Sequence, residues 1–391
     1  MPDHSDDELF LQRALDLARQ EIGLASPNPY VGAVIVDLQG NIVGTGSYTY
    51  DGMKHAEIRA LEQAAGKARD ATLYINLEPH AHQGRTPPCT DALIAAGIRR
   101  VVASMADPNP RVSGHGFEQL RTAGIQVGVG GLRAQARDLN AAFARYIRHG
   151  VPLVTLKSAM TLDGKIAASP AAKSGGKPGE PAGGWITGEA ARTHVQEQRH
   201  ASDAILVGVG TIVADDPLLT DRSAKPRRRP LLRVILDSRL RLPFCSRLVQ
   251  SVVKGTCRDE VLVFCSTADK ERKKQLQDLG VRVEQVPSDK EGRPDLHASL
   301  RRLGELEITS VMLEGGSRVN GQALLSGVVD KIFLYYAPQI LGDTEAVPFA
   351  AVANFAGRKQ SLRVRHSRLH HFGDDIAIEG YLRDPYEDDL V

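Results

Sequence analysis

The chain has 391 residues, of which 42% are hydrophobic and 25% are charged, and its formal net charge is +2. This length allows two or three domains with their own hydrophobic cores, and the near-neutral charge does not favour nucleic acid or an anionic membrane surface as a partner. No apolar run approaches the length of about 20 residues that a membrane span requires.

The composition also bears on the cellular compartment. The four cysteines are sparse and unevenly spread, which argues against a disulfide framework, and the acidic, polar start of the chain lacks the features of a signal peptide. We therefore expect a cytoplasmic globular protein whose partners are small molecules, with no nucleic acid and no membrane.

The first part of the chain alternates between helical and strand patterns. Helices are predicted over residues 5–23, 55–66 and 89–96, and strands over 31–36, 42–45, 71–77 and 99–104. This alternation is typical of a layered α/β sandwich. We assign residues 1–148 to this first domain.

The second part, residues 152–385, has the same kind of alternation. Strands are predicted over residues 153–157, 204–209, 232–237, 260–265 and 310–314, which indicates a largely parallel sheet. Residues 169–184 are rich in Gly, Pro, Ala and Lys and are interpreted as a loop inserted within this second domain.

Four residues of the first domain have the spacing of a catalytic metal site. His55 and Glu57 lie at the start of one predicted helix, and His80 and Cys89 flank a loop that leads into another. The order His-x-Glu, Pro-x, Cys resembles that of zinc-dependent nucleobase deaminases, in which the Glu carries protons and the metal activates water. The alternative is a set of unrelated polar residues, because His-x-Glu on its own often arises by chance.

Further motifs extend this resemblance to one family, the bifunctional deaminase/reductase of riboflavin biosynthesis. In chain order they are Asn28-Pro29, Val31-Gly32, His55-Ala56-Glu57, Leu77-Glu78-Pro79, Gly84-Arg85-Thr86-Pro87-Pro88-Cys89 and Asp107-Pro108-Asn109-Pro110. The resemblance implies a cytidine-deaminase-like three-layer α/β/α domain followed by a dihydrofolate-reductase-like α/β domain. It also implies a homo-oligomer.

The same resemblance implies two reactions, one of a hydrolase and one of an oxidoreductase. The first is the zinc-dependent deamination of a diaminopyrimidinone that carries a phosphoribosylamino group, and the second is the NADPH-dependent reduction of its ribosyl group to ribityl. The resemblance makes Glu57 the catalytic residue, His55, His80 and Cys89 the metal ligands, and it places Asn28 in contact with the pyrimidine nucleotide. Arg85 would contact it too, although a solvated loop arginine is the alternative.

Two residues depart from the family pattern. The family has Cys where this chain has His80, and it usually has His where this chain has Tyr48. Zinc accepts imidazole as well as thiolate ligands, so the metal can be retained, with lowered deaminase activity. The alternative is an enzyme that works only as a reductase and keeps a degenerate deaminase domain.

For the second domain, the resemblance rests on the motifs that run from Lys157 to Ala167, from Trp185 to Thr187 and from Val207 to Thr211, and on Glu314-Gly315-Gly316. It implies NADPH contacts from Ala159, Trp185, Thr211, Asp215, Ser238 and Gly316. It implies substrate contacts from Gly183, Arg199, Leu219, Arg222 and Glu314, with both arginines near the phosphate. Lys157 is a further candidate for a polar catalytic group.

The residues of the second domain also allow simpler interpretations. Arginines most often carry ordinary surface charge, and a Gly-Gly pair between a strand and a helix can be a plain turn. A different class of protein, a nucleic-acid-editing deaminase, would need a basic face and interleaved aromatic residues. The near-neutral charge and the aromatic content of 5% disfavour that class.

Overall fold

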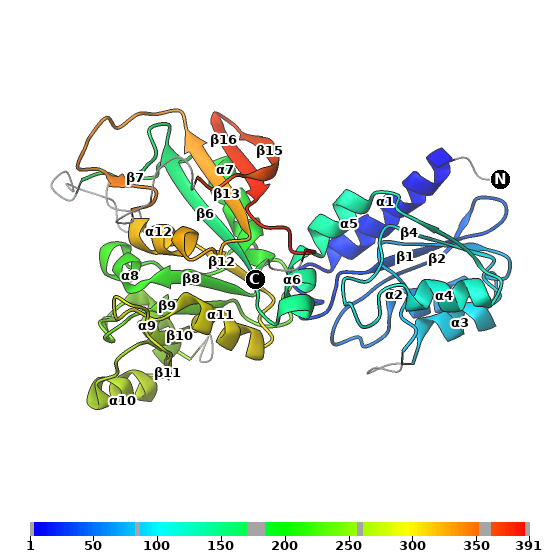
Figure 1. The fold of residues 1–391 in the computed structure, drawn as a ribbon, viewed down its shortest axis with the longest axis horizontal. Coiled ribbons are helices and arrows are strands. Elements are labelled where there is room, and N and C mark those ends of the chain that lie inside the picture. The colour runs from blue at the N-terminus through cyan, green and yellow to red at the C-terminus, as the bar shows by residue number, and fades with distance from the viewer. Residues whose placement is uncertain (1–3, 83–86, 170–183, 256–260, 352–360, 388–391) are drawn as a thin grey trace. The chain divides into compact units, whose positions relative to one another are not determined.

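The computed structural model describes residues 4–82, 87–169, 184–255, 261–351 and 361–387. The chain forms two compact units (Figure 1). The first comprises residues 1–150 with the short segments 226–228 and 390–391, and the second comprises residues 151–225 and 229–389. Within the described residues, no helix has both the length and the apolar character needed to cross a membrane.

The first unit is built on a five-stranded sheet in the order β2-β1-β3-β4-β5, in which β1 is antiparallel to both neighbours and the remaining pairs are parallel. Its elements are α1 (His4–Gln20), β1 (Gly32–Val36), β2 (Ile42–Ser47), α2 (Ala56–Ala64), β3 (Thr72–Ile75), α3 (Cys89–Ala95), β4 (Arg100–Ala103), α4 (His115–Thr122), β5 (Gln126–Val129), α5 (Arg133–Leu139) and α6 (Ala141–His149).

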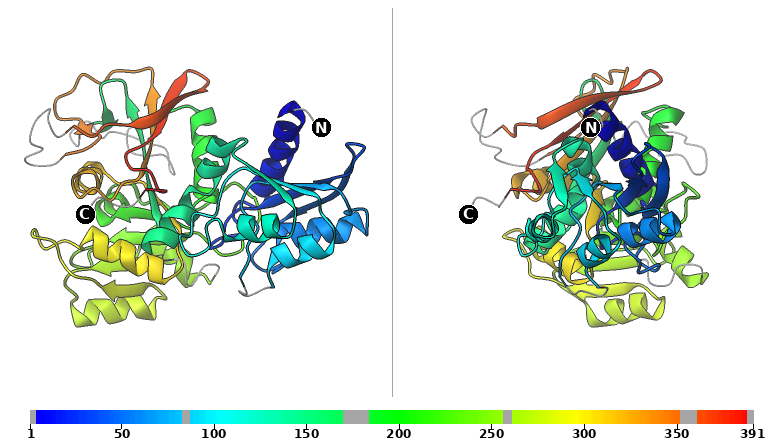
Figure 2. Two further views of the ribbon diagram at one scale, coloured as in Figure 1. Left: turned by 45° about the vertical axis from the view of Figure 1, so that its right-hand side comes forward. Right: turned by 90° about the vertical axis from the view of Figure 1, so that its right-hand side faces the viewer.

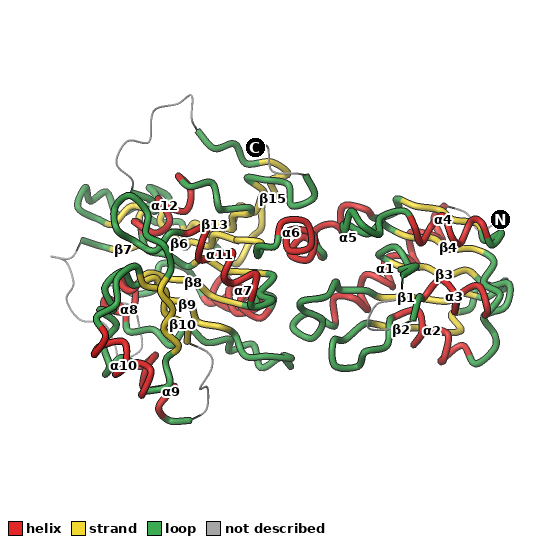
Figure 3. The backbone as a smooth tube through the Cα atoms, turned by 60° about the horizontal axis from the view of Figure 1, so that its bottom comes forward, coloured by secondary structure: helices red, strands yellow, loops and turns green. Residues whose placement is uncertain are grey.

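Helices cover both faces of this sheet. Apolar side chains of α2, α3 and α4 pack on one face, and those of α1 pack on the other. The strands, yellow in Figure 3, therefore lie between two helical layers (Figure 1). Two glycines of β2 allow α2 to approach closely, since a Cβ atom at Gly44 or Gly46 would lie 2.1 Å from a carbonyl oxygen of α2. This contact fixes the start of α2, where a predicted metal ligand lies.

The second unit contains a nine-stranded sheet in the order β11-β10-β9-β8-β12-β6-β13-β16-β15 and a small two-stranded sheet, β14-β7. Its elements are β6 (Leu153–Thr161), β7 (Lys165–Ala167), α7 (Glu189–His200), β8 (Ala204–Gly208), α8 (Val209–Asp215), β9 (Leu232–Leu236), α9 (Arg247–Val253), β10 (Val261–Cys265), α10 (Lys270–Asp278), β11 (Arg282–Gln285), α11 (Leu296–Glu305), β12 (Ser310–Leu313), α12 (Ser317–Leu325), β13 (Lys331–Ala337), β14 (Val347–Pro348), β15 (Arg365–Phe372) and β16 (Asp375–Tyr381).

The large sheet is parallel from β11 to β13, and only β16 and β15 run antiparallel to their neighbours. Helices α11 and α12 pack on one face, and α8, α9 and α10 pack on the other. The largely parallel sheet predicted for this unit is therefore confirmed. Strands β11 and β13 and the hairpin of β15 and β16, red in Figure 2, were not predicted. Of the predicted inserted loop at 169–184, residues 170–183 lie outside the described residues.

Candidate active sites

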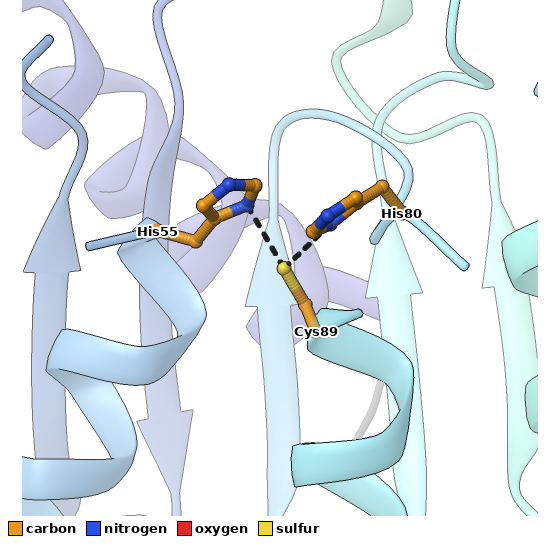
Figure 4. A group of neighbouring side chains, drawn as sticks. All are labelled: His55, His80 and Cys89. Carbon is orange, nitrogen blue, oxygen red and sulfur yellow. Dashed lines mark hydrogen bonds between the residues drawn. The ribbon is translucent and has the colours of Figure 1, made fainter. Parts of the chain in front are cut away.

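The three predicted metal ligands of the first unit converge (Figure 4). Cys89 is the first residue of α3, His55 is the N-cap of α2, and His80 lies in the loop that follows β3. The Cys89 Sγ atom lies 2.9 Å from Nδ1 of His55 and 2.8 Å from Nδ1 of His80. Because two helices start at this point, residues that are 34 positions apart in the chain present their donor atoms to one centre.

This donor set suits a zinc ion. The three ligand atoms lie within 4.8 Å of one another, and two imidazoles with one thiolate, leaving a fourth position open, match the ligands of catalytic zinc. Burial raises the pKa of the Cys89 thiol, and the Glu57 carboxylate raises this pKa further. The thiol therefore needs a nearby cation to become a thiolate, and a metal ion supplies that charge.

A cavity is lined by two of the three predicted ligands, His55 and His80. The side chain of Glu57 is only 3% exposed, and it lines this cavity together with Asn28 and Tyr48. Nδ2 of Asn28 donates a hydrogen bond to the Tyr48 hydroxyl at 2.5 Å. The structure thus brings Asn28 to the same cavity as these two predicted metal ligands and the predicted catalytic Glu57. Arg85, the other predicted contact to the pyrimidine, lies outside the described residues.

Two carboxylates of the same cavity received no role from the sequence. Glu78 is buried and accepts hydrogen bonds from the backbone N–H groups of four residues. These are Asp107, Gly114, Gly116 and Phe117. Burial raises the pKa of Asp107 to about 6, and the nearby Glu78 carboxylate contributes to this pKa shift against an opposing backbone hydrogen bond from Asn109. Both carboxylates lie in motifs on which the family resemblance rests, and this position was the signal from which the sequence could have identified them as site residues.

In the second unit, Glu314 is the centre of a charged cluster. The guanidinium of Arg199, on α7, forms a two-pronged ion pair with Glu314, with distances of 2.7 and 3.0 Å. Nζ of Lys157 lies 3.8 Å from the same carboxylate. The strand register explains this meeting, because β12 pairs in parallel with β6 and places Glu314 beside Lys157. The predicted residues Lys157, Arg199 and Glu314 are therefore brought together.

The cluster determines the charge of its own members. Burial alone would raise the pKa of Glu314, but Arg199 and then Lys157 outweigh burial and hold this pKa at about 2. Burial lowers the pKa of Lys157, and the carboxylate of Glu314 partly opposes that change. Glu314 is therefore ionised at neutral pH, and its charge is stabilised by two cationic side chains.

Two residues that support Lys157, namely Tyr335 and His194, were not predicted from the sequence. Nζ of Lys157 lies over the ring of Tyr335 on β13, 5.9 Å from its centroid. The Tyr335 hydroxyl is 2.7 Å from Nδ1 of His194 on α7. These residues are separated by 141 positions in the chain, so no local pattern connects them.

Of the six predicted NADPH contacts, all but Trp185 lie along one end of the parallel sheet. Ala159 is on β6, Ser238 follows β9, and Asp215 ends α8 with its side chain exposed. Thr211 on α8 lies close to Gly316, because its Oγ1 atom would be 3.9 Å from a Cβ atom built there. Ligands of open α/β sheets bind at the carboxyl ends of the strands, where these residues lie.

The start of α12 fits a phosphate group of this cofactor. Gly316 is the N-cap of α12 and provides no side-chain cap, so the first backbone N–H groups of the helix remain available. The hydroxyl of Ser317 is buried, and it has no hydrogen-bond partner among the described residues. An anion at this point would receive hydrogen bonds from both kinds of donor.

The other predicted residues of the second unit are more dispersed. Trp185 is 47% exposed, and the Arg192 guanidinium lies 5.0 Å from its ring centroid. Leu219 is buried with a positive φ of 55°, and its neighbour Thr220 accepts a hydrogen bond from Arg199. Arg222 is exposed. Gly183 lies outside the described residues.

Comparisons with known proteins agree with both sites. Residues 4–105 match the family model of the cytidine and deoxycytidylate deaminase zinc-binding region, and residues 152–378 match that of the RibD C-terminal domain. The fold and the two sites thus define an enzyme with a zinc-binding deaminase half and a reductase half that uses NADPH. The match to the zinc-binding region favours two activities over the reductase-only alternative.

Full-length relatives identify the family. The riboflavin biosynthesis protein RibD of Aquifex aeolicus is 38% identical over 95% of this chain and 97% of its own, and that of Escherichia coli is 37% identical over 95% and 98%. The chain belongs to the RibD family of riboflavin biosynthesis proteins. The predicted family, fold class and cofactors are thereby confirmed.

Solved structures support the same assignment. Acinetobacter baumannii RibD is 34% identical, with a TM-score of 0.81, and the match covers 97% of this chain and 99% of that one. A diaminohydroxyphosphoribosylaminopyrimidine deaminase/5-amino-6-(5-phosphoribosylamino)uracil reductase from Thermotoga maritima is also 34% identical, with a TM-score of 0.77 and the same coverage. The similarity therefore extends over both units.

Proposed function

We propose that this chain carries out both reactions named for its Thermotoga maritima relative. Residues 1–148 would hydrolyse the amine from the diaminohydroxyphosphoribosylaminopyrimidine, and residues 152–385 would reduce the ribosyl group of the resulting uracil derivative with NADPH. The convergence of His55, His80 and Cys89 beside Glu57 carries this proposal, because it supplies a complete donor set in spite of the exchange of Cys for His at position 80.

The roles in the first unit follow from its geometry. His55, His80 and Cys89 would hold a zinc ion, and the chemistry that such an ion would supply is the activation of a water molecule toward the ring carbon that bears the amine. The carboxylate of Glu57 takes up a proton from the water and gives a proton to the departing ammonia, so that a carbonyl oxygen replaces the amine. Burial of Glu57 in the wall of the cavity keeps this carboxylate beside the reacting carbon.

In the second unit, bound NADPH would supply the hydride for the anomeric carbon of the opened sugar. Lys157 is the proton donor that we assign to this step. Its ammonium is largely buried, and burial lowers its pKa, which makes proton release easier. Arg199 keeps Glu314 ionised and in place, and this ion pair leaves the exposed Arg222 as the better candidate for the substrate phosphate.

The remaining assignments concern the surroundings of the enzyme. We propose that the remaining predicted contacts act as the family resemblance implies, and that the protein works in the cytoplasm as a homo-oligomer. The sparse cysteines, of which the three in the described residues are free, support the compartment. Light scattering coupled to size-exclusion chromatography would measure the oligomeric state, and a monomer at micromolar concentration would contradict it.

The two activities can be separated in one experiment. The purified chain is given the diaminopyrimidine nucleotide with and without NADPH, and ammonia release and NADPH oxidation are followed independently. We expect ammonia release with and without NADPH, and, where NADPH is present, its oxidation after the ammonia is released. NADPH oxidation that requires an already deaminated substrate, with no ammonia from the diamino compound, would show that the first unit is not a deaminase.

A variant sharpens the role of position 80. His80→Cys restores the thiolate that the family carries, and it should keep one zinc ion per chain while it raises the rate of ammonia release several-fold. A second thiolate adds negative charge to the centre and makes the activated water a stronger nucleophile. His82→Ala is a matched control, because this exposed imidazole contacts His80 only edge to face. If His82 rather than His80 bound the zinc ion, His82→Ala would lose zinc and ammonia release, and His80→Cys would leave both unchanged.

A further inference from the structure

The residue at position 48 occupies a defined place in the wall of the deaminase cavity. Tyr48 follows β2, its backbone N–H donates to the carbonyl of Val31 at 2.9 Å, and its side chain is 7% exposed. The ring meets the imidazole of His55 edge to face, with 5.7 Å between centroids. Tyr48 is therefore held by its backbone and by its ring, and only its hydroxyl is directed at a polar neighbour in the cavity wall.

That neighbour is the side-chain amide of Asn28. The amide donates through Nδ2 to the Tyr48 hydroxyl at 2.5 Å, and both residues line the cavity with His55, Glu57 and His80. Within the part of the chain that the structure describes, this is the one hydrogen bond made by the Asn28 side chain. The pair joins a loop after α1 to the end of β2 across 20 positions of sequence.

An asparagine amide has two chemically different ends, and its hydrogen bonds decide which end meets a ligand. The Tyr48 hydroxyl can donate as well as accept, and in the structure it accepts from Nδ2, which leaves the carbonyl oxygen of Asn28 as an acceptor. An acceptor suits the N–H edge of a pyrimidinone, which lies next to the carbon that carries the amine. The opposite orientation would present N–H donors and would suit a ring carbonyl.

We propose that Tyr48 is a positioning residue of the deaminase site, and that its hydroxyl orients the Asn28 amide so that its carbonyl oxygen accepts a hydrogen bond from the N–H edge of the pyrimidine. This inference rests on the proposed deaminase activity of the first unit. It gives the departure from the family at position 48 a defined role, since a phenol there acts on Asn28 and does not need to touch the reacting atoms.

The test is the Tyr48→Phe variant, which keeps the ring against His55 and removes the hydroxyl. We expect the KM for ammonia release to rise about tenfold, with a smaller change in kcat, because one orienting hydrogen bond is lost from substrate binding. The zinc content and the NADPH oxidation by the second unit should not change. Tyr48→His, which can again pair with Asn28, should recover most of the loss.

A second tyrosine separates positioning from stability. Tyr74 is also buried, and its hydroxyl donates to Asp7 at 2.9 Å, away from the cavity. Tyr74→Phe should lower the melting temperature without changing the KM for ammonia release. An unchanged KM in Tyr48→Phe, or an equal change in both variants, would overturn the proposal.

Failure of the proposed function has a different signature. A wild-type chain that releases no ammonia would refute the deaminase activity, whatever Tyr48 does. The pairing is then decided by crystal structures of the wild-type and Tyr48→Phe chains. We expect the Asn28 amide to turn or to shift when the hydroxyl is removed. An amide that keeps its position and its orientation without the hydroxyl would refute the positioning role.

Discussion

The two polar centres of this protein balance buried negative charge in different ways. In the second unit, the charge of Glu314 is balanced by Arg199 and Lys157, so the cluster is complete with protein groups alone. In the first unit, the converging groups are two imidazoles, the Cys89 thiol and the Glu57 carboxylate, none of which is permanently cationic. The first centre therefore depends on an added cation, whereas the second does not.

The largest expected effect tests this dependence on a metal. Removal of zinc with a chelator, or the Cys89→Ala substitution, should lower ammonia release on the order of a thousandfold or more, because the metal supplies several kcal/mol of transition-state stabilisation. NADPH oxidation with the deaminated substrate should not change. Metal analysis and separate assays of the two activities would check both statements.

A matched cysteine serves as the control for that experiment. Cys245 is exposed, and Cys245→Ala should affect neither zinc content nor either activity. Loss of NADPH oxidation on chelation would contradict this difference between the two centres, since it would mean that the second centre also needs a metal. Full ammonia release by a zinc-free chain would contradict it too, since it would mean that the first centre needs none.

The convergence of the three predicted metal ligands could be anticipated from sequence because each lies where a helix begins or where a short loop leads into one. His55 and Cys89 start α2 and α3, and such starts are marked by local pattern. The pairing of Asn28 with Tyr48, and the Glu78 carboxylate that binds a loop about 30 positions away, have no such local signal. Contacts of this kind arise only when the strands are assembled.

The same limit applies to the second unit. Five strands of its parallel sheet were predicted because they are short, continuous apolar runs, whereas β11 and β13, in which polar residues interrupt the apolar ones, were not predicted. Strand β15 is almost entirely exposed and carries polar residues, so no hydrophobic period marks it. The residues Arg199 and Glu314 were predicted singly, but their ion pair joins positions 115 apart and could not be deduced from either segment.

The charged cluster of the second unit should show the next largest effect. Glu314→Gln removes the carboxylate and leaves the charges of Arg199 and Lys157 largely buried without it, which should destabilise the second unit by about 3 kcal/mol and lower NADPH oxidation about a hundredfold. Ammonia release should stay at the wild-type level. Steady-state kinetics of both activities and chemical denaturation would measure these effects.

The control for this variant is another ion pair of the same unit. Glu284 pairs with Arg302 at 2.7 Å, but both side chains are considerably more exposed than those of the Glu314 cluster. Glu284→Gln should cost about 1 kcal/mol or less and should leave NADPH oxidation unchanged. An equal loss of NADPH oxidation in Glu284→Gln and Glu314→Gln would show that Glu314 contributes to stability only and has no part in the reaction.

The smallest expected effect is a pH dependence that belongs to the first unit. Burial raises the pKa of Asp107 to about 6, against an ordinary value of 3.8. The folded state therefore binds more protons than the unfolded state between these values, so the stability contributed by protonated Asp107 is lost as the pH rises from about 4 to about 6. Asp107→Asn stays neutral and should gain about 1–3 kcal/mol over the wild type across this window.

An aspartate of the second unit provides a contrast of opposite sign. A hydrogen bond from Thr161, with others from backbone N–H groups, lowers the pKa of Asp163 to about 2. The stability from Asp163 is present above its ordinary pKa and is lost only as the pH falls toward 2, so Asp163→Asn should differ from the wild type by a constant amount between pH 4 and 6. Urea denaturation at several pH values distinguishes the cases. A constant difference for Asp107→Asn as well would mean that the carboxylate of Asp107 is accommodated in the folded cavity as easily as in water.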